Sequence, residues 1–185
     1  QLFNTRINEI NGFHYRRILN IFQDSKHNIW LSTDQGLYRA NPTKFQIQKE
    51  LFPFFRKLNI SRVRQIVQHA SKPHLEWVAN SNYGLFLYDK VRQKIIKSFE
   101  MPGSGITQIK YDRHGRLWVL SAKMLTIIDA QLRIKIITTT HLKPNLLCWR
   151  IIFDRYDNAW IGSEIGLLKV SFPTHTLTVR SPDIT

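Results

Sequence analysis

The chain has 185 residues, 43% of them hydrophobic, which is enough to bury roughly 70% of the unfolded surface in a globular core. No apolar run approaches the ~20 residues needed to span a bilayer, and the first residues lack the apolar region of a secretory signal. The net charge of +14 can attract an anionic partner, but the basic residues are spread along the chain without a basic run, which argues against nucleic acid.

The chain begins with a short segment and then repeats one pattern. Residues 1–17 contain a strand-like stretch around Leu2–Ile10, followed by Asn11-Gly12, a turn signal. From residue 18 onward, one pattern recurs over approximately 18–50, 63–99, 106–138 and 148–180. Self-similarity at a period of this size is typical of repeat architectures.

The repeated pattern is organised around a tryptophan. The four copies, at spacings of 47, 41 and 42 residues, are Trp30, Trp77, Trp118 and Trp160. In three copies an aspartate stands six residues earlier, at Asp24, Asp112 and Asp154. In three copies a glycine follows six or seven residues later, at Gly36, Gly84 and Gly166. His69 replaces the aspartate in the second copy, and Met124 replaces the glycine in the third.

A structural role accounts for each repeated residue type. An aspartate before a tight turn accepts hydrogen bonds from turn amides. A glycine permits positive φ where one strand folds back on the next. A tryptophan packs a large face between neighbouring sheets. We therefore expect these residues to build the scaffold.

Each copy predicts four short strands separated by turns. In the first copy, apolar or alternating stretches lie at 18–22, 29–33, 37–39 and 44–48, with polar breaks between them. Four antiparallel strands in a meander form one blade of a β-propeller. The predicted fold is therefore all-β, with four four-stranded antiparallel blades in residues 18–185.

Residues 1–17 are then interpreted as the outer strand of a preceding blade plus a linker. That strand is one too many for a closed four-bladed ring, so we expect a fragment of a longer propeller. A fragment would expose the flat apolar faces of its end blades, and exposed apolar patches promote association. The expected consequence is self-association, for example as a dimer that completes a ring.

The sequence contains no motif for catalysis, a metal or a cofactor. The seven histidines show no paired ligand spacing. Gly103-Ser104-Gly105 lacks the third glycine and the following helix of a phosphate-binding loop. The single cysteine, Cys148, stands at an apolar repeat position and is expected to be a small core residue.

Propeller geometry places a binding surface at the starts of the inner strands, where the chain crosses from blade to blade. The variable residues there with the chemistry to bind a ligand are Arg17, Arg62, Arg64 and Trp149. An aromatic face stacks on sugar rings, and arginines bind carboxylate or sulfate groups. The alternative is that these are ordinary loop residues, with Trp149 covering the neighbouring blade.

Two segments carry a resemblance to a known family. They are ILNIFQDSKHNIWLSTDQGLY and WRIIFDRYDNAWIGSEIGLL, and Trp160-Ile161-Gly162-Ser163 within the second is close to a Trp-Ile-Gly-Thr motif. This pattern resembles the regulator-propeller repeats of two-component sensors over about residues 18–180. Those repeats form the extracytoplasmic sensing part of bacterial hybrid histidine kinases.

The resemblance implies a periplasmic sensor domain of an inner-membrane protein, without catalytic activity of its own. It also implies an oligosaccharide ligand, acidic or neutral, and a dimeric sensor, with membrane span and kinase in other parts of the parent protein. A protein-interaction propeller without a small-molecule ligand is the alternative. An enzyme of the lyase or glycosidase kind is the least favoured reading, because its paired carboxylates are not evident.

Overall fold

The structure is a computed structural model that describes residues 17–23, 27–34, 36–41, 46–50, 63–101, 105–122, 124–144 and 146–180. The strand expected within 1–17 lies outside these residues, as do Asp24 and Arg62. Within the described ranges, no helix has the length and apolarity to cross a membrane.

Sixteen strands are found in the described part of the chain, and they form four sheets. The first two sheets contain β1 (Ile18–Gln23), β2 (Ile29–Thr33), β3 (Gly36–Asn41) and β4 (Gln46–Glu50), then β5 (Val63–Gln68), β6 (Leu75–Asn80), β7 (Gly84–Asp89) and β8 (Lys94–Phe99). The last two contain β9 (Ile106–Tyr111), β10 (Leu117–Ser121), β11 (Met124–Ile128) and β12 (Ile134–Thr138), then β13 (Cys148–Phe153), β14 (Ala159–Ser163), β15 (Gly166–Ser171) and β16 (Thr176–Arg180).

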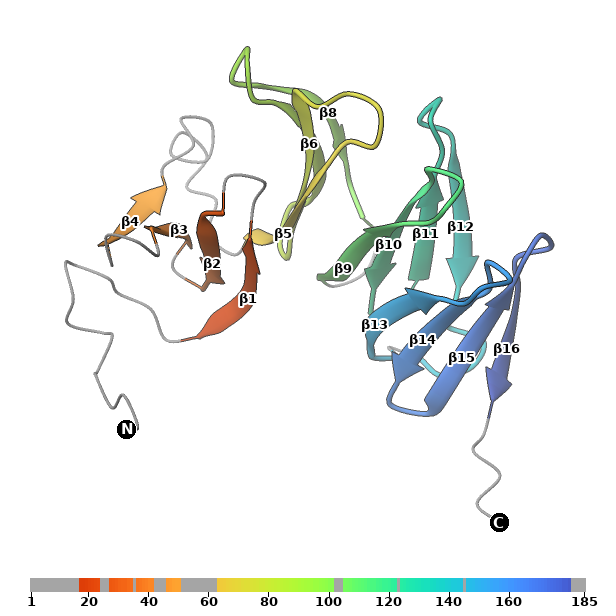
Figure 1. Ribbon diagram of the computed structural model, residues 1–185. Coiled ribbons are helices and arrows are strands. Elements are labelled where there is room, and N and C mark those ends of the chain that lie inside the picture. Colours follow the sequence, from red (N-terminus) through yellow and green to blue (C-terminus); the bar gives the residue numbers. More distant parts are fainter. Residues whose placement is uncertain are drawn as a thin grey trace.

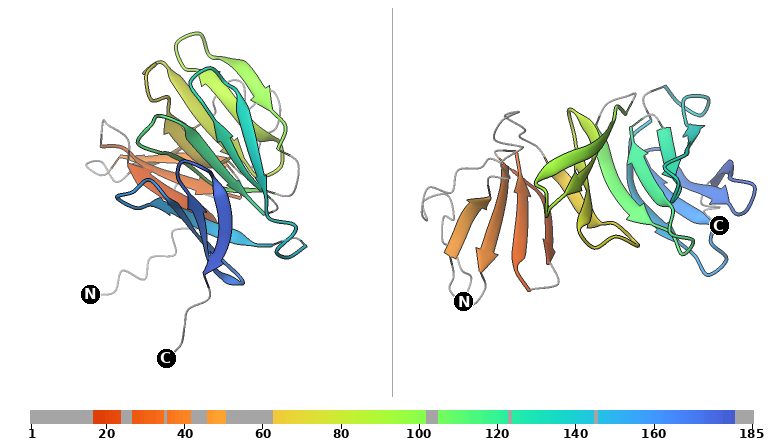
Figure 2. Two further views of the ribbon diagram at one scale, coloured as in Figure 1. Left: turned by 90° about the vertical axis from the view of Figure 1, so that its right-hand side faces the viewer. Right: turned by 90° about the horizontal axis from the view of Figure 1, so that it is seen from above.

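Each sheet is a meander in which every strand pairs antiparallel with the next strand along the chain. The sheets stand side by side in an arc, with β1, β5, β9 and β13 toward its centre and β4, β8, β12 and β16 at the periphery (Figures 1 and 2). Successive inner strands contact each other from sheet to sheet. The predicted fold class, all-β with four four-stranded antiparallel sheets, is therefore confirmed.

The core lies between the sheets rather than within one of them. One apolar cluster joins the second and third sheets and includes Trp77, Leu85, Ile106 and Ile109. A second cluster joins the third and fourth sheets and includes Trp118 and Ile151. We call the side of a sheet that carries its tryptophan the back face, and the opposite side the front face. The back faces of the second and third sheets thus pack on the front faces of the third and fourth.

The four tryptophans occupy the same register position. Each pairs with the next-to-last residue of its inner strand: Phe22, Val67, Lys110 and Ile152. Trp77 and Trp118 are each only 1% exposed, because a following sheet covers them. Trp30 and Trp160 are half-buried. The tryptophan position is therefore equivalent in register in all four sheets, but the tryptophans differ in burial.

An aspartate ties the tryptophan to the turn that precedes it. Asp112 accepts backbone N–H bonds from His114 and Arg116 at 2.9 Å through Oδ1. Its Oδ2 accepts a bond from Trp118 Nε1 at 2.8 Å and an ion-paired bond from Arg116 Nε at 2.6 Å. One carboxylate therefore closes the β9–β10 turn and satisfies the indole N–H buried between two sheets.

Asp154 makes the same arrangement in the fourth sheet. It accepts bonds from the backbone N–H groups of Tyr156 and Asn158, and its Oδ2 accepts the N–H of Trp160 at 2.8 Å. The bond from Trp160 is the largest cause that holds the pKa of Asp154 at about 2. The carboxylate is thus stabilised in its charged form, as its role as an acceptor requires.

The repeated glycines adopt the positive φ that the repeat pattern favours. Gly36, Gly84 and Gly166 have φ of 132°, 89° and 109°. At Gly84 a Cβ atom would lie 2.4 Å from the carbonyl oxygen of Phe99, so space as well as backbone conformation excludes a side chain. The tight return from β6 to β7 therefore depends on glycine at this position.

Replacing Gly84 by alanine should lower the free energy of unfolding by about 1–3 kcal/mol or more, because strain at positive φ adds to the contact with Phe99. Gly115→Ala is the control for φ alone, since Gly115 has φ of 70° and open space at its Cβ. Gly162→Ala, which has open space and no positive φ, should change stability little. Urea denaturation measures all three, and equal losses at Gly84 and Gly115 would contradict the steric part.

Replacing Asp112 by alanine should destabilise the chain by about 3 kcal/mol, because it leaves the buried Trp118 N–H and the Arg116 guanidinium without their acceptor. Asp129→Ala is the control. Asp129 caps the β11–β12 turn and pairs with Arg133, but it binds no tryptophan. Denaturation curves should show the smaller loss for the control, and a loss as large would show that the indole bond contributes nothing.

Candidate ligand-binding face

The two ends of the blades differ. At one end the inner strands begin and the chain crosses from sheet to sheet; we call this the connection end. At the opposite end lie the turns that Asp112 and Asp154 close, and we call it the turn end. The sequence places its candidate binding residues at the connection end.

A β-bulge interrupts each inner strand at the connection end. The register skips one residue between Ile18 and Asn20, between Val63 and Gln65, and between Cys148 and Arg150, and it shifts in the same way at the start of β9. The bulged residues are Leu19, Arg64, Thr107 and Trp149. A bulge leaves its residue outside the ladder and changes the direction of its side chain. Two of the predicted ligand-binding residues, Arg64 and Trp149, thus occupy equivalent bulge positions.

Arg64 leans across the boundary between the second and third sheets. Its Nε donates to the carbonyl oxygen of Thr107, the bulged residue of the next sheet, at 3.4 Å. Partial burial and the positive charge of Arg150 both lower the pKa of Arg64, burial having the larger effect. The positive charges of Arg64 and Arg150 therefore interact, and both lie at the connection end.

Trp149 and Arg17 are both open to solvent. The Trp149 side chain is 50% exposed, in contrast to the tryptophans of the repeat. Arg17 is exposed, and its backbone forms a reciprocal pair with Asp34, in which each backbone N–H is bound by an oxygen of the other residue. Leu147 and Glu164 make the corresponding pair in the fourth sheet. Of the predicted binding residues, Arg64 lies near enough to Arg150 of the fourth sheet for their charges to interact. Arg62 lies outside the described residues.

The sequence interpretation missed a pair of glutamines beside the bulges. Gln65 Oε1 accepts the backbone N–H of Ile109 at 2.9 Å, and Gln108 Oε1 accepts that of Ile151 at 2.7 Å. Each bond links the inner strand of one sheet to that of the next. The sequence does contain a pattern that could have revealed them. An amide side chain precedes an isoleucine at the same repeat position in Asn20-Ile21, Gln65-Ile66 and Gln108-Ile109.

A hollow of about 280 Å³ lies at the connection end between the second and third sheets. It is lined by the turn after β6 and the segment before β9, through Asn80, Ser81, Asn82, Gly84, Met101, Gly105 and Ile106. The Asn80 side chain accepts the N–H groups of Asn82 and Tyr83 and holds this turn. The described lining residues thus offer amide, hydroxyl and backbone groups for hydrogen bonding, and none of them has an ionisable side chain.

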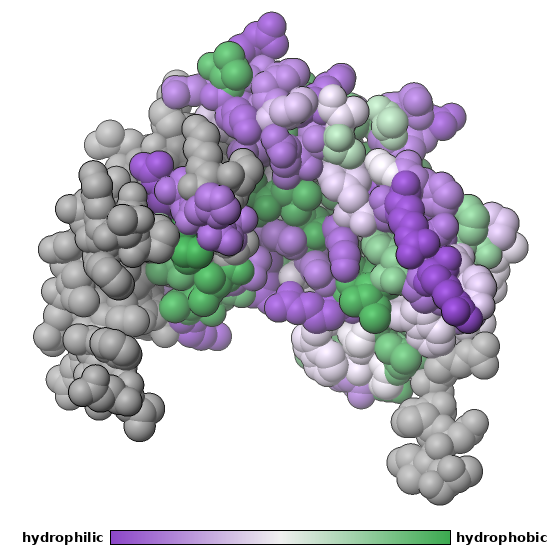
Figure 3. Space-filling model, viewed as in Figure 1, coloured by the Kyte–Doolittle hydropathy of each residue, from purple (hydrophilic) through white to green (hydrophobic). Residues whose placement is uncertain are grey.

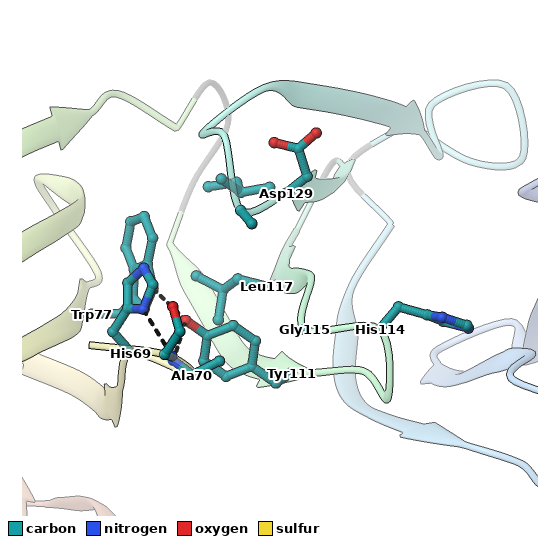
Figure 4. Close-up of a pocket in the computed structure, with 11 residues that line it drawn as sticks. His69, Ala70, Trp77, Tyr111, His114, Gly115, Leu117 and Asp129 are labelled. Carbon is teal, nitrogen blue, oxygen red and sulfur yellow. Dashed lines mark hydrogen bonds between the residues drawn. The ribbon is translucent and has the colours of Figure 1, made fainter. Parts of the chain in front are cut away.

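A second hollow of about 130 Å³ lies at the turn end between the same two sheets. Figure 4 shows His69, Ala70 and Trp77 grouped with Tyr111 on one side, Asp129 across from them, and His114 directed away. The His69 ring stacks on Trp77 with centroids 6.2 Å apart. Burial, then the charges of Lys72 and His74, lower the pKa of His69. The histidine is therefore held toward its neutral form.

At this second hollow the Tyr111 hydroxyl accepts the indole N–H, because His69 stands where the third and fourth sheets have an aspartate. Trp77 Nε1 donates to the Tyr111 hydroxyl at 2.7 Å, and the backbone N–H of Ala70 donates to the same oxygen at 3.2 Å. In the third and fourth sheets the corresponding indole bond is made by an aspartate within the sheet. In the second sheet it therefore crosses to the neighbouring sheet.

Across the described ranges, no three His, Cys, Asp or Glu side chains are grouped so that they could hold a metal ion. Cys148 is 1% exposed, and burial followed by the charge of Glu164 raises the pKa of its thiol to about 11. The thiol is thus an apolar core group in the cluster between the third and fourth sheets.

No family model and no curated protein matches the chain by sequence. By structure, it is similar to the extracellular domain of BT3049 from B. thetaiotaomicron, assigned to a hybrid two component system. The TM-score is 0.69 at 14% identity, and the match covers 90% of this chain and 22% of that one. The chain therefore spans less than a quarter of that domain.

Two other solved structures are similar to the chain. The WD40 β-propeller domain of Doa1 has a TM-score of 0.62 at 12% identity, over 92% of this chain and 53% of that one. Virginiamycin B lyase from Staphylococcus aureus has a TM-score of 0.61 at 15% identity, over 88% of this chain and 55% of that one. At these identities the likeness shows the fold, and the four sheets are β-propeller blades. The fold implied by the regulator-propeller resemblance is thus confirmed.

Replacing Tyr111 by phenylalanine should cost about 1–3 kcal/mol of stability, because the buried Trp77 N–H loses its acceptor. In a His69→Asp background the same replacement should cost less, because an aspartate at position 69 restores the acceptor of the other sheets. Thermal or urea unfolding of the four variants gives the coupling energy. Additive effects would show that the hydroxyl and the position-69 side chain do not serve the same indole.

Proposed function

We propose that this chain is a non-catalytic, ligand-binding segment of a sensor propeller in a two-component signalling protein, and that it detects a glycan-derived oligosaccharide. The observation that carries the proposal is the set of bulges at the connection end. They hold an exposed tryptophan and an arginine at equivalent positions of different sheets. The likeness to the extracellular domain of BT3049 supports a sensing role.

The chemistry at the connection end suits a saccharide with acidic groups. The exposed indole of Trp149 offers a flat apolar face for a sugar ring. The guanidinium groups of Arg64 and Arg150 supply positive charge and paired donors for carboxylate or sulfate. The hollow beside them, lined by Asn80 and Ser81, supplies further hydrogen-bonding groups for hydroxyls. The net charge of +14 would speed the approach of an anionic chain.

The location and the catalytic state follow from the same proposal. The sensor would face the periplasm as part of an inner-membrane protein, and the kinase and membrane span would belong to the parent protein. The chain itself would bind its ligand without converting it. The likeness to virginiamycin B lyase concerns the fold, and the described residues that line the hollow at the connection end include no carboxylate or histidine.

The second candidate function is a protein-docking propeller, which the likeness to the WD40 domain of Doa1 favours. A protein-docking surface would not distinguish a charged saccharide from a neutral one. A gene that joins this chain to a kinase domain would favour the sensor, and binding measurements separate the two directly.

Arg64→Ala and Trp149→Ala should each weaken the binding of an acidic oligosaccharide by roughly tenfold, because each removes one recognition element. Calorimetric titration with sulfated or uronic-acid oligosaccharides, compared with their neutral counterparts, measures the effect. Arg64→Lys should lie between wild type and Arg64→Ala, because lysine keeps the charge but loses the planar fork.

The matched control is a second arginine–aromatic pair at the turn end. The Arg155 guanidinium lies 4.8 Å from the centroid of the exposed Tyr156 ring, so it has the same chemistry in a different place. Arg155→Ala and Tyr156→Ala should leave the affinity unchanged. Unchanged affinity in Arg64→Ala and Trp149→Ala would refute the site, and binding of neither acidic nor neutral saccharides would favour the docking propeller.

A further inference from the structure

Three basic side chains meet at the turn end of the boundary between the third and fourth sheets. Arg116 stands before β10, Lys135 lies on β12, and His175 stands before β16. The Arg116 Nη1 atom lies 3.1 Å from Nε2 of His175, and the Lys135 Nζ atom lies 3.1 Å from Nδ1 of the same ring. Figure 3 shows strongly hydrophilic surface where these two sheets meet. We call Arg116, Lys135 and His175 the basic cluster.

The repeat architecture does not require a histidine at this place. The turns that lead into the outermost strands of the last three sheets each end in a residue with positive φ: Gln93, Leu132 and His175 have φ of 52°, 62° and 58°. Leu132 packs on the apolar cluster between the second and third sheets. His175 instead lies next to Trp118, with ring centroids 5.9 Å apart, and makes the two polar contacts of the basic cluster. A leucine therefore serves the scaffold at this position, and the histidine adds chemistry that packing does not need.

An imidazole between two cations has a conflict in its hydrogen bonding. Arginine and lysine side chains only donate, and a neutral imidazole accepts at one nitrogen and donates from the other. Arg116 is fixed by its ion pair with Asp112 at 2.6 Å, and its side chain is only 19% exposed, whereas Lys135 is exposed. Nε2 of His175 is therefore the acceptor for Arg116, and Nδ1 carries the hydrogen atom.

Two donors then converge without an acceptor between them. The Nδ1–H group of His175 and the ammonium group of Lys135 face each other across 3.1 Å. Within the described ranges Lys135 forms no ion pair, so no carboxylate relieves this contact. Arg116 adds to the surplus of donors, because its Nη2 atom is buried and has no hydrogen-bond partner in the same part of the chain. Asp112 supplies one negative charge, against the two positive charges of Arg116 and Lys135.

We propose that the basic cluster is a binding site for an oxoanion group, a phosphate or a sulfate, which bridges Lys135 Nζ and His175 Nδ1. One oxygen of such a group accepts from both donors, and charge-assisted hydrogen bonds of this kind are among the strongest in proteins. The anion also balances the excess positive charge of the cluster. The site lies at the opposite end of the blades from Arg64 and Trp149, so it does not depend on the proposed function.

Anion binding at this site should be coupled to proton uptake by His175. Burial, then the charges of Lys135 and Arg116, lower the pKa of His175, and Asp112 raises it. The charged groups on or beside the ring are Asp112, Arg116, Lys135 and, next to Phe172, the paired His114 and Asp157. An anion at Nδ1 favours the imidazolium, so the pKa of His175 is higher in the complex than in the free chain. The affinity should therefore rise as the pH falls from the higher of these two pKa values to the lower, and level off below it.

The test is nuclear magnetic resonance of the 185-residue chain with sulfate as the probe. The imidazole nitrogen shifts report both the tautomer and the protonation of His175. We expect the Nδ1–H tautomer where the ring is neutral, and saturable shifts of the ring when sulfate replaces chloride at constant ionic strength. Sulfate keeps its own charge between roughly pH 5 and 8, the range in which histidine titrates. Its affinity should increase as the pH falls, by at most about tenfold per pH unit.

Lys135→Gln should weaken sulfate binding by about tenfold or more, because it removes one charged donor. The matched control is Lys97→Gln. Lys97 has the same place in the second sheet as Lys135 in the third, since each is paired, through one intervening residue, with the tryptophan of its sheet. The turn of the next sheet there carries Leu132 instead of a histidine, so Lys97→Gln should leave sulfate binding at His175 unchanged.

His175→Leu places in the fourth sheet the residue that the third sheet has at Leu132, so the variant should remain folded, which its melting curve checks. It should abolish the pH-dependent sulfate shifts in the backbone amides of Thr174 and Thr176. Arg64→Ala, at the connection end, should keep the sulfate response of His175 whether or not it loses the binding of an oligosaccharide. The two sites are therefore tested separately.

Methyl sulfate is the second probe, because it distinguishes the source of the oxoanion group. Tighter binding than sulfate assigns the site to an esterified group of a larger ligand, and weaker binding assigns it to a free anion. Three results would overturn the site: an Nε2–H tautomer of neutral His175, no saturable sulfate shift of its ring, or an equal loss of binding in Lys135→Gln and Lys97→Gln.

Discussion

The structure depends on one constraint: the second and third four-stranded sheets are apolar on both faces. A sheet of this kind cannot leave either face in water, so it is stable only between two neighbours. The packing of the second sheet on the third, and of the third on the fourth, supplies the two largest apolar clusters of the described residues. In the second and third sheets this gives tryptophans that are 1% exposed.

Burying an indole between sheets creates a polar requirement, because the ring N–H loses water and must find an acceptor. The turn aspartate meets this requirement and holds its own turn with the same carboxylate. The second sheet, with His69 in place of the aspartate, meets it through the Tyr111 hydroxyl of the next sheet. In the second, third and fourth sheets the indole N–H therefore has an acceptor, but the residue that supplies it differs.

The sequence was informative wherever a feature is local to one repeat. The strand quartets, the register position of the tryptophans and the positive φ of Gly84 all follow from patterns within about forty residues. The bonds from Gln65 and Tyr111 could not be read in the same way, because their partners lie in a neighbouring sheet and depend on how the sheets are placed. The bulge that displaces Trp149 was also hidden, since a bulge is a property of pairing between strands.

The bulges give the repeat scaffold one variable position in each inner strand. The backbone irregularity is present in all four inner strands, so it belongs to the architecture. Its side chain lies outside the ladder and is therefore not fixed by the inter-sheet core. Leucine, arginine, threonine and tryptophan occupy this one position in successive sheets: Leu19, Arg64, Thr107 and Trp149. Residue types this different are tolerated where packing does not select the side chain, and under the proposed function such a position binds the ligand.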